Sequence, residues 1–210
     1  MEKPLICIKS CHRHHARRVA QQETWLPGLD WADYIWVIGE PRVVIVDTLS
    51  CLVDDGFANI APKVWCACAH ALDHNITQMF VCDDDTYVMP GRLYKASKKY
   101  QEYAGFMRTS GLFYNDDKPY AQGSGYWIGE RSMEHVVRAG ETIMVNGCID
   151  DGAVGRALHG KVPFVHDDRY QPGPEPVPIW LPKYSETITT HKCLPGIMEA
   201  THTLVRRHNV

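Results

Sequence analysis

Apolar and polar positions follow two repeating patterns along the chain, and these patterns predict the order of its strands and helices. Short apolar runs bounded by polar residues are typical of buried strands, whereas longer amphipathic stretches are typical of helices. Strands are expected at 5–10, 34–39, 43–47, 78–83, 104–107 and 121–128, and helices at 14–25, 58–72, 91–101, 130–138 and 151–159. Turn residues at 111–119 and a proline-rich stretch at 171–182 predict loops. The alternation of strands and helices predicts an α/β fold.

One apolar run, at 78–82, ends in three consecutive carboxylates: Asp83, Asp84 and Asp85. Adjacent like charges repel, so a fold keeps them only with compensation, and hard divalent cations prefer carboxylate oxygens. Ligands of open α/β sheets gather beyond the carboxyl ends of strands, where this cluster is expected. Residues two apart on an extended chain face the same side, so Asp83 and Asp85 can act together. The alternative is a solvated acidic turn.

Length, charge and cysteine usage narrow the class of protein. A chain of 210 residues is expected to form one domain, 1–210. Its 22 basic and 25 acidic residues give no overall signature of polyanion binding. No apolar stretch approaches the roughly 18 residues that cross a bilayer, and the chain leads directly into its first strand, so we expect a cytoplasmic protein of a bacterium or a virus-infected cell. The eight scattered cysteines are expected to be buried free thiols.

Six segments resemble, in the same order, the motifs of glycosyltransferase family 31, the β-1,3-glycosyltransferases that include the core 1 synthase and Fringe enzymes. They are RRVAQQETW (17–25), DGFANIAPK (55–63), DDDTYV (83–88), PYAQGSGY (119–126), DDGAVG (150–155) and THK (190–192). The resemblance implies a GT-A fold with a single Rossmann-like nucleotide-binding sheet flanked by helices. It also implies an inverting transferase that uses a UDP-sugar donor and Mn2+, with Mg2+ as the alternative ion, and forms a β linkage.

The resemblance also implies roles for individual acidic residues and histidines. Asp85 is expected to bind the metal directly, while Asp83 and Asp84 reach the metal or the donor. His191 is the expected metal histidine, and His166 stays open as the competing candidate. The carboxylate of Asp151 is expected to act as the base that takes the proton from the acceptor hydroxyl. Its alternative role is to cap the helix that starts there.

Other residues are expected around the donor. The first strand closes with Ile8, Lys9 and Ser10, which are expected to contact the base and ribose. Arg18 is expected to reach a phosphate or the base edge. Asp55 and Lys63 are expected to shape the site, with Lys63 pairing either with Asp55 or with an aspartate of the triplet. Gly123 and Gly125 are expected to let the donor or acceptor approach the backbone closely, because glycine has no Cβ.

Two further groups of residues, one at 12–15 and one at 126–127, also suggest possible binding roles. The histidines and arginine at 12–15 are expected to be solvated at the opening of a helix. Tyr126 and Trp127 are expected to offer an aromatic platform to the acceptor, although core packing explains aromatic residues equally well.

The chain also departs from the family pattern. Gln22 stands where the family has a second arginine, and Gly152 and Ala153 replace bulkier residues beside Asp151. We expect the protein to lack the membrane anchor of the Golgi enzymes, so the expected acceptor is a glycan, a protein side chain or a hydroxymethylated DNA base. The alternative function is a catalytically silent module that binds a sugar nucleotide or a glycan.

Overall fold

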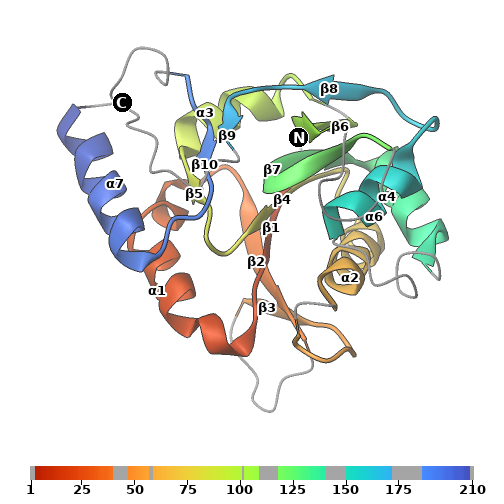
Figure 1. Cartoon of the computed structure of the whole chain (residues 1–210), viewed down its shortest axis with the longest axis horizontal. Helices are drawn as coiled ribbons and strands as arrows, with labels where there is room; N and C mark the ends of the chain where they lie inside the picture. The colour runs from red at the N-terminus through yellow and green to blue at the C-terminus, as the bar shows by residue number, and fades with distance from the viewer. Residues whose placement is uncertain are drawn as a thin grey trace.

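A seven-stranded mixed sheet forms the centre of the protein (Figure 1). The structure is a computed structural model that describes residues 3–39, 47–56, 59–100, 102–108, 118–140, 150–171 and 186–208. The sheet is built from β1 (Leu5–Lys9), β2 (Asp33–Ile38), β3 (Thr48–Ser50), β4 (Gln78–Asp83), β6 (Tyr103–Arg108), β7 (Tyr120–Gly129) and β8 (Phe164–His166), in the order β3-β2-β1-β4-β7-β6-β8. The first four strands in this order run parallel, and β7 is antiparallel to both of its neighbours.

Helices cover both faces of the sheet. They are α1 (His15–Glu23), α2 (Ile60–Asp73), α3 (Pro90–Ser97), α4 (Glu130–Arg138), α6 (Asp150–Leu158) and α7 (Pro195–His208), with single 3-10 turns at His12–His14 and Leu26–Gly28. In Figure 1, α1 and α7 lie on one side and α2, α4 and α6 on the other. The strands alternate accordingly: Ile6 and Ile8 pack toward α1, α3 and α7, whereas Leu5 and Cys7 pack toward α2, α4 and α6.

The chain changes direction between β1 and β4. It runs outward from β1 to β2 and β3, then returns through α2 to place β4 on the other side of β1, where Lys9 is paired with Asp83. The carboxyl ends of β1 and β4 therefore flank a topological switch point, the usual ligand site of an open α/β sheet.

A second, small sheet brings the C-terminal part of the chain to this edge. It contains β5 (Tyr87–Val88), β9 (Tyr170–Gln171) and β10 (Thr189–Thr190), with β10 in the middle. The strand β10 is antiparallel to β5 and parallel to β9. The Cys193 N–H then donates to the Asp85 carbonyl at 2.7 Å, which fastens the segment after β10 to the aspartate triplet.

The expected α/β class is confirmed, and most of the expected elements are present. The expected strand at 43–47 lies outside the described residues except for Asp47, and β3 follows it directly. Most of the loops expected at 111–119 and 171–182 also lie outside the described residues. Among the described residues, β5, β8, β9, β10 and α7 were not expected from the sequence, nor was β3 at its observed bounds.

The described residues also test the expectations about cysteines and membrane-spanning segments. The seven cysteines in this part of the chain are free thiols, as expected; five of them are buried, whereas Cys11 and Cys66 are only partly buried. Over the same residues, no helix has both the length and the apolar character that crossing a membrane requires.

Candidate functional site

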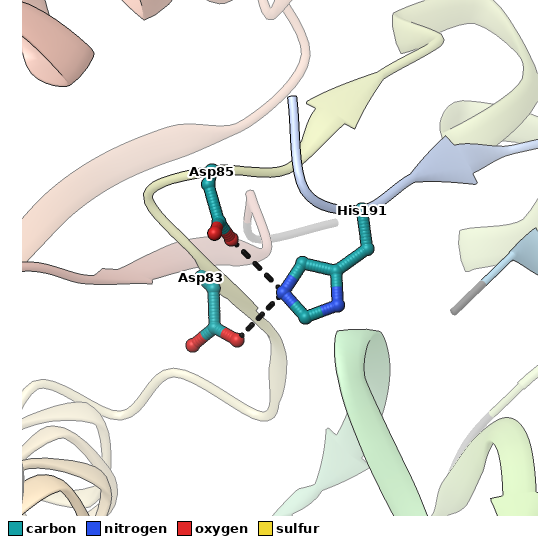
Figure 2. Close-up of side chains that lie close together, drawn as sticks. All are labelled: Asp83, Asp85 and His191. Atoms are coloured by element: carbon teal, nitrogen blue, oxygen red, sulfur yellow. Dashed lines mark ion pairs between the residues drawn. The ribbon is translucent and has the colours of Figure 1, made fainter. Parts of the chain in front are cut away.

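Two aspartates and a histidine converge beyond the carboxyl end of β4 (Figure 2). Asp83 ends β4, Asp85 lies in the turn that follows, and His191 comes directly after β10. The His191 Nε2 lies 2.9 Å from Asp85 Oδ1 and 3.1 Å from Asp83 Oδ2. One ligand atom from each of the three residues lies within 4.8 Å of the others. Residues more than a hundred positions apart thus meet at one point because β10 pairs with β5.

The chemistry of this cluster fits a divalent cation. Asp85 Oδ1 and His191 Nε2 are both buried, and neither makes an aligned hydrogen bond despite their short separation. These two atoms form an ion pair in the metal-free protein, and a cation that displaced the His191 proton would bind to both. Carboxylate oxygens suit Mg2+ and Mn2+, and imidazole is a common ligand of transition metals. The set therefore fits Mn2+ well and accommodates Mg2+.

The electrostatics of the cluster keep the carboxylates ionised. Burial raises the pKa of Asp83, but the Lys9 ammonium and His191 outweigh it, so the pKa lies below its usual value. Burial likewise raises the pKa of Asp85, and His191 outweighs it in the lowering direction. For His191, burial lowers the pKa, but the two carboxylates raise it to about 9. In the absence of a cation, the imidazolium therefore balances part of the negative charge.

The competing histidine lies elsewhere. His166 is exposed at the end of β8, where its Nδ1 accepts a hydrogen bond from the Met107 N–H at 3.1 Å. Its ring packs on Phe106. Of the two candidates, the structure brings His191 to the aspartates.

Asp84 does not belong to the cluster of possible metal ligands and is bound by protein groups. Its Oδ2 accepts hydrogen bonds from Ser10 Oγ and contacts His14 Nδ1, each at 2.7 Å, and its Oδ1 accepts from Arg17 at 2.7 Å. The residue is buried. The His14 side chain is 40% exposed, in line with the expectation of a solvated cluster, but the sequence did not predict its contact with Asp84. The predicted contact of Asp84 with the donor stays a prediction, since its oxygens are already bonded to these three groups.

Arg18 is also engaged by the protein. Its guanidinium donates to Ser10 Oγ at 3.0 Å and to the Cys11 carbonyl, and the residue is buried. It holds the segment between β1 and α1 in place. Its predicted contact with a phosphate or the base edge stays a prediction.

Lys63 pairs with Asp55, one of the two partners that the sequence left open. The Lys63 Nζ donates to Asp55 Oδ1 at 2.7 Å and to the Ser10 carbonyl at 2.8 Å. Asp55 also accepts from the backbone N–H groups of His12 and Gly39, at 2.5 and 2.6 Å. This network ties together the segments that follow β1 and β2, so the structure gives both residues a shaping role at the edge of the site.

The candidate base lies beside the metal cluster. Asp151, in the first turn of α6, accepts a hydrogen bond from the Gly123 N–H to its Oδ2 at 2.6 Å. Its Oδ1 lies 3.5 Å from the Lys9 Nζ, which itself lies 3.0 Å from Asp83 Oδ1. The sequence placed Lys9 near the base and ribose; the structure buries it between the two carboxylates.

Gly123 and Gly125 in β7 are required for different reasons. A Cβ at Gly123 would lie 3.2 Å from Asp83 Cγ and 3.4 Å from Asp151 Oδ2, and would collide with Asp83 Oδ2. At Gly125, φ is +130°, and a Cβ would collide with the Phe80 ring. Gly123 therefore makes room for the carboxylates of the site, whereas Gly125 is explained by packing against Phe80. A close approach of the donor to either glycine stays a prediction.

Some features of the site were missed or misread. Tyr126 and Trp127 are fully buried, so the expectation of an aromatic platform for the acceptor is wrong. Arg17 and Lys192 lie 3.6 and 3.5 Å from Asp85 Oδ2 and give the cluster a cationic rim. Lys192 has φ of 63°, a backbone conformation that non-glycine residues rarely adopt and that is common at functional sites. The sequence gives little sign of such roles, because a lysine or arginine at the end of a strand or beside a ligand motif is common in proteins without a ligand site.

Comparison with known proteins identifies the fold. No protein-family model matches the chain, and no curated protein matches it. One similar solved structure is described as the crystal structure of a glycosyltransferase involved in the glycosylation of the major capsid of PBCV-1. It covers 94% of this chain and 100% of its own, with a TM-score of 0.55 and 14% sequence identity. The expected membership of family 31 stays a prediction, while the mixed α/β fold of this chain is similar to the fold of that glycosyltransferase.

Proposed function

We propose that this protein is a metal-dependent inverting glycosyltransferase that moves a sugar from a UDP-sugar to an acceptor hydroxyl and forms a β linkage. The observation that carries this proposal is the convergence of Asp83, Asp85 and His191 at a switch point of the sheet, with Asp151 beside them. A fold shared with a glycosyltransferase supports it.

The site contains a group of possible metal ligands and a separate candidate base, and both are needed for this reaction. In an inverting transfer, the acceptor oxygen bonds to the anomeric carbon while the bond to the diphosphate oxygen breaks on the opposite face. A bound Mn2+ or Mg2+ would stabilise the negative charge that develops on the leaving diphosphate. Asp83, Asp85 and His191 would hold that ion, and Arg17 and Lys192 at its rim add positive charge on the same side.

Asp151 is suited to take the proton of the acceptor hydroxyl. Its carboxylate lies near the metal cluster without belonging to it, since one oxygen accepts from the Gly123 N–H and the other faces Lys9. A general base must lie within hydrogen-bond reach of the proton that it removes. This separation supports a site in which the leaving group and the acceptor bind at different places.

The acceptor is best sought among protein-linked glycans and protein side chains. The similar solved structure is described as acting in the glycosylation of a viral capsid, which supports an acceptor of this kind. The net charge of −3 disfavours a DNA base as the acceptor, because nucleic acid attracts basic surfaces.

The first test is a thermal-shift panel with UDP, GDP, CDP and ADP, each with and without Mn2+. We expect the melting temperature to rise with UDP only when Mn2+ is present, and Asp85→Asn to remove that rise. If no nucleotide stabilises the protein in a metal-dependent way, the proposal fails. A screen of UDP-sugars for slow hydrolysis then identifies the donor. Binding of UDP and Mn2+ with neither hydrolysis nor transfer would instead indicate the catalytically silent module.

A further inference from the structure

Lys9 is a buried lysine at the carboxyl end of β1, inside the candidate site. Its side chain is 3% exposed, and lysine is rarely buried to that extent without a charged partner. The Nζ lies 3.0 Å from Asp83 Oδ1 and 3.5 Å from Asp151 Oδ1. A single ammonium group therefore contacts both a candidate metal ligand and the candidate base.

Each of the two carboxylates is held from a second direction. The other oxygen of Asp83 lies 3.1 Å from His191 Nε2, and the other oxygen of Asp151 accepts from the Gly123 N–H at 2.6 Å. Lys9 thus attracts the second oxygen of Asp151 as an ion pair at 3.5 Å, and attraction from a second direction restricts the rotation of this carboxylate. A base that is fixed in this way keeps its remaining lone pairs aimed at one place, which is what proton transfer requires.

The same ammonium opposes cation binding. A divalent cation bound to Asp83 would share this carboxylate with the Lys9 ammonium group. Two positive charges on one carboxylate lie close together and repel each other. This repulsion disfavours metal binding, whereas the attraction between Lys9 and Asp151 benefits the candidate base.

We propose that Lys9 is a positioning residue that orients Asp151 for proton transfer and, in doing so, weakens the affinity of Asp83 and its neighbours for a divalent cation. The inference rests on the proposed function for the role of Asp151. It predicts effects of opposite sign on cation binding and on turnover, which a purely structural role for Lys9 does not.

The test compares Lys9→Met and Lys9→Arg with the wild-type protein and with Lys161→Met, a control at an exposed lysine. Calorimetric titration with Mn2+, in the presence and absence of UDP, gives the cation affinity. Hydrolysis of the UDP-sugar that the wild-type protein consumes fastest gives kcat and KM. For Lys9→Met we expect Mn2+ to bind about 3- to 10-fold more tightly and kcat to fall by about 100-fold with little change in KM. Lys9→Arg keeps the charge, so its Mn2+ affinity stays near wild type and part of kcat returns.

The pathway from Lys9 to Asp151 is tested by combining Lys9→Met with Asp151→Asn. If Lys9 acts through Asp151, the double variant turns over no more slowly than Asp151→Asn alone. Independent, additive losses would overturn the inference.

Three outcomes separate this inference from the proposed function. If Lys9→Met binds Mn2+ more weakly as it loses activity, Lys9 only holds the site together, and the inference is overturned. If the wild-type protein hydrolyses a UDP-sugar and Lys9→Met does so at the same rate, the inference alone fails. If the wild-type protein binds neither Mn2+ nor UDP, the proposed function fails. Should Lys9→Met not fold, Lys9→Arg decides: a lower kcat at unchanged KM and Mn2+ affinity supports the inference, and an unchanged kcat overturns it.

Discussion

Replacing Gly123 with alanine is expected to damage the metal cluster while leaving the fold almost intact. The added Cβ would lie 3.2 Å from Asp83 Cγ and closer than 3.0 Å to Asp83 Oδ2. It would meet Asp151 Oδ2 at 3.4 Å, an ordinary van der Waals contact. Only Gly125 and Gly160 among the described glycines have a positive φ, so the backbone at position 123 accepts alanine without strain.

The geometry gives the size of the effect. Ordinary contacts begin at 3.4 Å, so the Asp83 oxygen must retreat by at least about 0.4 Å, whereas metal–ligand distances tolerate about 0.2 Å. We therefore expect Asp83 to be lost as an effective ligand and the Mn2+ affinity to fall on the order of 10- to 100-fold, or about 1.4–2.8 kcal/mol. The fold itself should change little, because a glycine-to-alanine change at a permitted backbone conformation gains about 0.4–1 kcal/mol of free energy of unfolding.

Calorimetric titration with Mn2+ and chemical denaturation without metal measure the two effects separately. Gly196→Ala in α7 is the matched control, because a Cβ there meets nothing within 4 Å. Gly125→Ala is the contrasting variant, since its positive φ and the Phe80 ring predict a loss of stability without a specific loss of metal affinity. Wild-type Mn2+ affinity in a folded Gly123→Ala protein would refute the assignment of Asp83 as a metal ligand.

Three further predictions address the charges of the site. Because the pKa of His191 is raised from 6.5 to about 9, its stabilising contribution to the metal-free protein is full below pH 6.5 and is lost as the pH rises through about 9. Binding of Mn2+ at pH 7 should accordingly release about one proton, measured by calorimetry in buffers of different ionisation enthalpy, and no release would contradict imidazole ligation. Asp84→Asn should lower the free energy of unfolding by about 1–3 kcal/mol in urea, because it weakens the bonds to Arg17 and His14, while Mn2+ affinity stays close to wild type. Asp151→Asn should keep UDP and Mn2+ binding while transfer falls by about 10²- to 10⁴-fold; transfer at the wild-type rate would show that another group is the base.

The sequence was sufficient where a local pattern decides the outcome. The apolar runs of β1, β2, β4, β6 and β7 are buried on both faces, so their hydrophobicity alone marks them as strands. The sequence was a poorer guide to short strands, which form only by pairing with other strands. The two-residue strands β5, β9 and β10 are too short to have a periodicity, and only their pairing with one another defines them.

The candidate site shows the same division. The sequence by itself determined that carboxylates cluster after a buried strand, which follows from the order of residues along β4. Only the tertiary structure decided which residues join them. His191 meets Asp85 because β10 pairs with β5, whereas His166 ends an edge strand far from the cluster. The turn after β4 likewise separates Asp84 from its neighbours, and burial of Lys9 links Asp83 to Asp151. These are contacts between distant segments, and they depend on strand pairing and packing that no local pattern records.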